Sequence, residues 1–138
     1  MTIDSDYLLL TAALSLLISL GLAWLASFIL YADIKVLKRV FPATHQLIRA
    51  HIDYLLMCLL LVVCYYLIDK LTLGIPAWVI YTTCFGALYN PFGFIVLAIK
   101  PQMAKPKTTT DKARILFGFF PATIGYGYIM TTVILALL

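Results

Sequence analysis

The sequence predicts an all-α membrane protein, a single domain built as a four-transmembrane-helix bundle. Of its 138 residues, 64% are hydrophobic and 12% are charged, whereas an average soluble domain is about 45–50% apolar and about 25% charged. Four apolar runs each provide the roughly 20 residues that cross the hydrocarbon core of a bilayer. The connections between them are short, so neighbouring helices should be antiparallel.

The predicted helices follow one another with little chain between them. The apolar runs lie at 7–31, 47–68, 77–99 and 115–138. Pro42 and Pro76 suit the first turn of a helix, and Asp111 is a candidate cap for the fourth helix. The predicted helices therefore extend over residues 7–31, 43–69, 76–99 and 112–138, which form one domain.

Small residues and prolines mark where helices approach one another or bend. The first run carries a small residue at every fourth position, a pattern that allows close approach of another helix in lipid: Thr11, Ser15, Ser19, Ala23 and Ser27. We call these five residues the small-residue ladder, and its partner can be in the same chain or in another copy. Pro91 and Pro121 should each free a backbone carbonyl inside a helix, and a kink is expected at Asn90-Pro91.

Ionisable residues near the start of the second helix are candidates for function, because such groups are costly inside a membrane. Arg49 and Asp53 lie four residues apart and can form an ion pair, which is either structural or functional. His51 points to another side of the helix, where Cys58 and Tyr65 follow at seven-residue steps. It can be a ligand or an acid–base group. The alternative is a polar anchor that bonds a carbonyl and interfacial water.

Asn90 is the polar candidate of the third helix, about 15 Å from its basic end, and His51 should lie one to two turns shallower. A ligand the size of a porphyrin could bridge the two levels. Tyrosines in the second and third helices are available as hydrogen-bond donors or stacking surfaces: Tyr54, Tyr65, Tyr66 and Tyr89. The alternative for Asn90 is a hydrogen bond between helices.

Several classes of chemistry lack the motifs they need. The sequence has no phosphate-binding lysine loop, no nucleophile elbow and no HExxH motif. An ion pump normally requires several buried carboxylates, and Asp53 is the single candidate. The three cysteines, Cys58, Cys64 and Cys84, lie in apolar runs without CxxC spacing and should be small buried hydrophobes.

The segment Leu-Ile-Arg-Ala-His at 47–51 resembles the Arg-Ala-His that opens the second helix of styrene oxide isomerases, small four-helix membrane enzymes related to hydroxylaminobenzene mutases. Asn90 is similar to the third-helix asparagine of that family. The resemblance implies a homotrimer that binds haem b between protomers, with His51 as the axial iron ligand. Asp53, Tyr54 and Met57 differ from the small-residue stretch and asparagine of the family, and Phe94 replaces a tyrosine.

The expected function is therefore a haem-dependent membrane isomerase that rearranges a small lipophilic, epoxide-like substrate by Lewis-acid catalysis. His51 would be the metal ligand, with Tyr65 beside the haem b. Asn90, Tyr54 and Asp53 would be the catalytic residues. The alternative is a non-catalytic membrane protein, either an accessory subunit or a small-solute carrier.

Basic residues gather in the first and third loops. Nine of the ten Lys and Arg residues lie at 35–49 and 100–114, and Lys70 lies on the other side. The positive-inside rule then places these loops in the cytoplasm and both termini on the non-cytoplasmic side, with a bacterial inner membrane as the expected location. Short basic loops without interleaved aromatic residues favour contact with anionic lipid over nucleic-acid binding.

Single cysteines substituted for Thr2 and Lys105 test this orientation, in a chain whose native cysteines are replaced by alanine. On intact cells, a membrane-impermeant thiol reagent should label position 2, because the third loop would be shielded by the membrane. Labelling at position 105 without labelling at position 2 would overturn the orientation.

Overall fold

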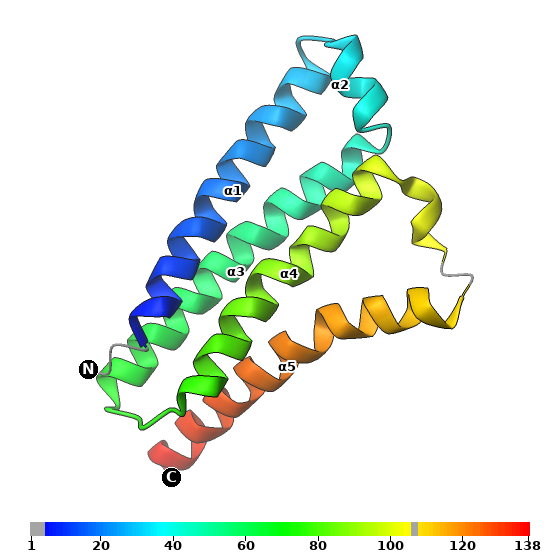
Figure 1. Ribbon diagram of the computed structural model, residues 1–138. Helices are drawn as coiled ribbons and strands as arrows, with labels where there is room; N and C mark the ends of the chain where they lie inside the picture. The colour runs from blue at the N-terminus through cyan, green and yellow to red at the C-terminus, as the bar shows by residue number, and fades with distance from the viewer. Residues whose placement is uncertain (1–4, 106–107) are drawn as a thin grey trace.

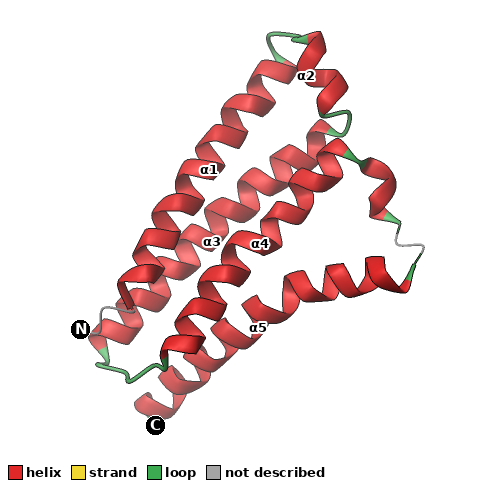
Figure 2. Ribbon diagram, in the orientation of Figure 1, coloured by secondary structure: helices red, strands yellow, loops and turns green. Residues whose placement is uncertain are grey.

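The computed structural model describes residues 5–105 and 108–138, which form an all-helical bundle (Figure 1). Its elements are α1 (Asp6–Leu30), α2 (Lys35–Val40), α3 (Thr44–Lys70), α4 (Ala77–Ile99), the 3₁₀ helix η2 (Pro101–Ala104) and α5 (Thr109–Leu137). Figure 2 shows helices joined by loops, with no strand in this described part of the chain. Four of the helices are long and apolar enough to span a membrane, which confirms the predicted fold class.

The predicted boundaries agree within a residue or so for α1, α3 and α4. The start of the fourth helix differs, because α5 begins at Thr109, so Asp111 lies within its first turn and does not precede it. The short helices α2 and η2 were not predicted. Pro91 and Pro121 both lie inside continuous helices.

α1 and α3 pack along a heptad-like seam. The buried positions of α3 alternate in steps of three and four residues: Leu47, Ala50, Tyr54, Met57, Leu61, Cys64 and Ile68. On α1 the buried residues repeat at sevens in two series: Leu8, Ser15, Leu22 and Ile29, and Ala12, Ser19 and Ala26. This spacing keeps one stripe of each helix facing its neighbour over the whole length.

Hydrogen bonds between helices fix the register of α3 against α4. The Ala43 N–H, just before α3, donates to the Ala98 carbonyl near the end of α4, at 3.2 Å. The Tyr54 hydroxyl donates to the Leu88 carbonyl at 2.9 Å. Because the two helices are antiparallel and rise equally, residues whose numbers sum to about 141 lie at the same level.

α4 and α5 cross tightly at small residues. A Cβ on Gly86 would lie 2.4 Å from the Ala122 backbone nitrogen, and one on Gly125 would lie 2.2 Å from the Thr83 hydroxyl oxygen. Pro121 immediately precedes Ala122 at this crossing. From there the first half of α5 separates from α4 (Figure 1), so the two helices form a V.

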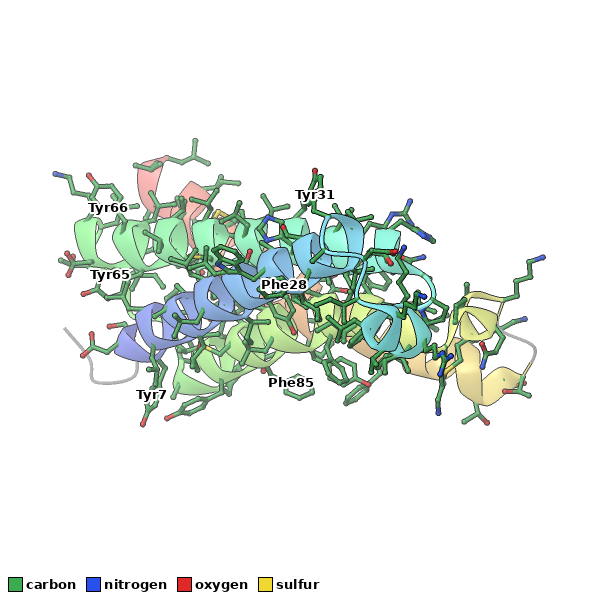
Figure 3. The ribbon with its side chains drawn as sticks, turned by 90° about the horizontal axis from the view of Figure 1, so that it is seen from above. Tyr7, Phe28, Tyr31, Tyr65, Tyr66 and Phe85 are labelled. Carbon is green, nitrogen blue, oxygen red and sulfur yellow. The ribbon has the colours of Figure 1, made fainter. Side chains whose placement is uncertain are left out.

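The two ends of the bundle differ in chemistry. One end carries α2 with its lysines and η2 between Lys100 and Lys105, and we call it the basic end; the other carries both termini (Figure 1). Near the termini, the ring centroids of Tyr7 and Tyr81 are 5.5 Å apart. In Figure 3 the Tyr7 and Tyr31 side chains point outward from the bundle, and Tyr31 belongs to the basic end. Aromatic side chains at both ends are typical of the two membrane interfaces.

The α4–α5 crossing makes Gly86 sensitive to a single methyl group. We expect Gly86→Ala to lower the free energy of unfolding by about 1–3 kcal/mol, because the new Cβ must push the α5 backbone away. Gly127→Ala is the matched control on α5, since no described atom lies within 4 Å of its Cβ position; it should be neutral or stabilise by up to about 1 kcal/mol. Thermal unfolding in detergent, followed by circular dichroism, measures both. Equal stability of the two variants would contradict the tight crossing.

Candidate functional site

His51 is bonded to Ser19 of α1 in a reciprocal arrangement. The Ser19 hydroxyl donates to the His51 carbonyl at 2.9 Å. The His51 Nδ1 lies 2.9 Å from the Ser19 carbonyl oxygen and 2.8 Å from its hydroxyl oxygen. A carbonyl can only accept, and the hydroxyl proton is already used, so we assign the ring proton to Nδ1. In the neutral ring, Nε2 then carries a free lone pair.

The surroundings of His51 agree with the predicted face of the helix. Cys58 and Tyr65 are partly buried like His51, whereas His45 is exposed at the basic end. Tyr65 is about 21 Å farther along α3. A ligand bound at His51 would therefore have to extend over this distance to contact Tyr65 of the same chain.

The small-residue ladder has a partner within the chain over its first half. Thr11, Ser15 and Ser19 are buried, and Ser19 contacts α3 through His51. Ala23 and Ser27 are only partly buried and line a shallow hollow of about 150 Å³ together with Leu20 and Trp24. The second half of the ladder is thus open at the bundle surface.

Tyr54 has a structural role in this chain. Its side chain is 2% exposed, and its hydroxyl donates to the Leu88 carbonyl. The donor predicted for catalysis is therefore used to tie α3 to α4.

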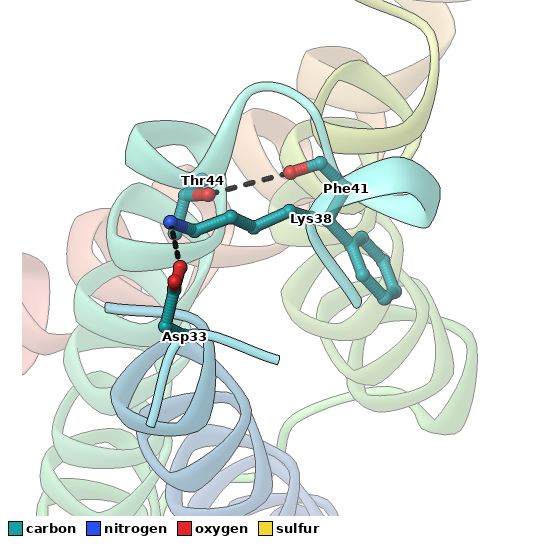
Figure 4. A network of polar contacts seen from close by, with 4 residues as sticks. All are labelled: Asp33, Lys38, Phe41 and Thr44. Carbon is teal, nitrogen blue, oxygen red and sulfur yellow. Dashed lines mark hydrogen bonds and ion pairs between the residues drawn. The ribbon is translucent and has the colours of Figure 1, made fainter. Parts of the chain in front are cut away.

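The predicted ion pair between Arg49 and Asp53 is not formed. Among the side chains that the structure describes, the ion pair is Lys38 with Asp33, shown in Figure 4. Arg49 is exposed and Asp53 is half-buried. A long cationic side chain near the basic end can extend toward the headgroups, and an exposed pair would add little stability.

Asn90 lines a cavity that the sequence did not reveal. The cavity, of about 510 Å³, lies between α4, η2 and α5, and its walls are mostly apolar; they include Tyr89, Phe94, Leu97, Met103, Ile115 and Phe119. The Asn90 side chain makes no hydrogen bond with any described residue, so the expected bond between helices is not formed. An apolar pocket of this size with a few polar side chains, here Asn90 and Tyr89, is typical of a small-molecule site.

Asn90 and His51 lie at one depth and on different sides. Ala43 is level with Ala98, so each of the two candidates is eight residues, or about 12 Å, from that level. The expected difference of one to two turns was therefore wrong, because α3 already begins at Thr44, near the level where α4 ends at Ile99, so His51 is as far from the basic end as Asn90. His51 faces α1 and Asn90 faces the α4–α5 cavity, so one chain does not bring them together.

The described residues include no group of three His, Cys, Asp or Glu side chains that could hold a metal ion. No protein-family model matches the chain, and comparisons with curated proteins and with solved structures find no match.

Proposed function

We propose that the chain is a homo-oligomeric membrane isomerase that binds haem b through His51 and rearranges a small lipophilic, epoxide-like substrate. The observation that supports this most is the bond from the His51 Nδ1–H to the Ser19 carbonyl. Histidines that ligate metals usually donate their second ring N–H to a carbonyl or carboxylate, which orients the ring and raises its basicity. His51 has this arrangement, with Nε2 left for iron.

The donor set suits a haem better than a bare ion. A porphyrin supplies four ligands itself and needs one axial side chain from the protein. One imidazole without further ligand residues nearby fits that need. When bound, the haem would supply a Lewis-acidic ferric iron, while Ser19 holds the His51 ring and apolar walls exclude water.

The α4–α5 cavity is the proposed chamber for the substrate. Its apolar lining suits a molecule that arrives from the lipid, and Asn90 is a polar group in it, next to Tyr89. The unbonded Asn90 amide would donate to the substrate oxygen and stabilise negative charge that develops there. Asp53, half-buried on α3, does not line this cavity in its own chain and would be a further polar group of the catalytic site.

A ring of copies would bring the two halves of the site together. Asp53 lies about 160° around α3 from His51. Met57 accepts a hydrogen bond from Tyr126 of α5, at 3.8 Å from oxygen to sulfur. The flank of α3 with Met57 therefore faces α5, and the flank with His51 faces α1. In a closed heterologous ring, opposite flanks of neighbouring copies meet. His51 of one copy would then face the Asn90 cavity of the next, and a trimer is the favoured ring.

A second function is a non-catalytic accessory subunit or small-solute carrier. It is favoured by the hydrogen bonds of His51 and Tyr54, which both end on backbone carbonyls of neighbouring helices. Both side chains would then only tie helices together. For either function, we propose that the basic end faces the cytoplasm of a bacterium and that the membrane is the inner one.

The haem content of His51→Ala beside His45→Ala tests the cofactor. We expect the wild-type protein and His45→Ala to show a Soret band and one haem for each His51 site. His45→Ala should keep its haem because His45 is exposed at the basic end. His51→Ala should lose nearly all haem while inserting normally. A full complement of haem in His51→Ala, or a wild-type protein without haem, would favour the non-catalytic alternative.

Cross-linking between differently tagged copies tests the shared site. In a chain without native cysteines, copies with His51→Cys and copies with Asn90→Cys are produced together and treated with a short bifunctional thiol reagent. We expect a covalent dimer of the two tags, and a mass in detergent of about three times 15.4 kDa. Copies with Leu59→Cys replace the His51→Cys copies as a control, since Leu59 is exposed about 12 Å away along α3. A monomeric protein without cross-links would contradict the interprotomer site.

A further inference from the structure

The short helix α2 has an apolar side and a cationic side. Leu37 and Phe41 are partly buried and pack against the core residues at the basic end of the bundle. Val36 is 68% exposed and Val40, one turn later, is also exposed. Lys35 and Arg39 lie on the opposite side of the helix from Leu37, at about 100° per residue. This arrangement is typical of a helix that lies in the membrane interface.

Local bonds hold α2 in place. Asp33 adopts a left-handed backbone conformation (φ 52°), which turns the chain after α1, and its carboxylate pairs with Lys38 (Figure 4). At the other end of α2, the Thr44 hydroxyl donates to the Phe41 carbonyl at 3.3 Å. The Ala43 N–H donates to Ala98 of α4. The helix is thus anchored to the bundle on both sides.

Two cations of α2 have no counter-charge among the side chains that the structure describes. Lys35 and Arg39 are exposed and form no ion pair with any described residue. They are four residues apart, so their Cβ atoms are about 6 Å from each other on one face. Lys38 differs, because Asp33 neutralises it. The unpaired positive charge of α2 is therefore concentrated at Lys35 and Arg39.

We propose that α2 binds the headgroup of an anionic phospholipid, with Lys35 and Arg39 on its phosphate and Val36 and Val40 beside the upper part of its acyl chains. The depth fits, because Tyr31, just before α2, is 87% exposed as an interfacial aromatic residue is. The charge fits, because two cations on one face complement one phosphate. This site is separate from His51 and does not depend on haem.

Lipid selectivity measured by electron spin resonance tests the site. The whole protein is reconstituted in phosphatidylcholine vesicles with trace spin-labelled phosphatidylglycerol or phosphatidylcholine. We expect the wild type to prefer phosphatidylglycerol. Lys35→Gln or Arg39→Gln should each lower this preference about 5-fold, and the double variant about 25-fold, since each cation near a membrane surface contributes about a factor of five.

Three controls separate a site on α2 from general attraction. The double variant Lys100→Gln, Lys105→Gln also removes two positive charges at the basic end, but it should keep most of the preference for phosphatidylglycerol. Lys38→Gln should have a smaller effect than Lys35→Gln, and inorganic phosphate should not compete with the lipid. No preference in the wild type, or an equal loss with the Lys100 and Lys105 pair, would overturn the proposal. The Lys35 and Arg39 side chains are exposed and unpaired, so their variants should fold normally.

Discussion

Close approach at small residues holds this bundle together, because lipid provides no hydrophobic force that drives apolar helices against one another. Ser15 and Ser19 are fully buried where α1 meets α3, and Gly86 and Gly125 leave no room for a side chain where α4 meets α5. The other features depend on these two contacts. The contact between α1 and α3 brings Ser19 to the His51 ring. The contact between α4 and α5 determines the point from which α5 diverges, and this divergence leaves the cavity between the two helices.

Most of the fold could be predicted because few backbone conformations are stable in the hydrocarbon core of a membrane. Backbone groups in the hydrocarbon core must be satisfied within a helix, so each long apolar run implies one spanning helix. The start of α5 at Thr109 was missed because its first residues are polar and give no hydropathy signal. The helix α2 was missed because six residues are too few for a periodic pattern, and its charges resemble those of a loop.

The candidate site was predictable only in part, and the limit is the geometry between helices. The face that His51 shares with Cys58 and Tyr65 follows from the helical period alone. Its bond to Ser19 depends on the register of α1 against α3, which one sequence does not contain. The depth of His51 relative to Asn90 was misjudged, because α3 begins before its apolar run and His51 therefore lies deeper than a count along that run suggests. The cavity beside it depends on the angle between α4 and α5, which local sequence patterns do not determine.

The divergence of α5 gives the chain a wedge-shaped outline that is wider toward the basic end (Figure 1). Such a molecule displaces more lipid from one leaflet than from the other. In a flat bilayer the two leaflets must still cover equal areas. Lipids are therefore crowded against the outer side of α5 in the leaflet where the protein is wider. Membrane curvature relieves this crowding, and tighter lipid packing increases it. The elastic energy of the bilayer therefore acts on the same interhelical angle that sets the width of the cavity.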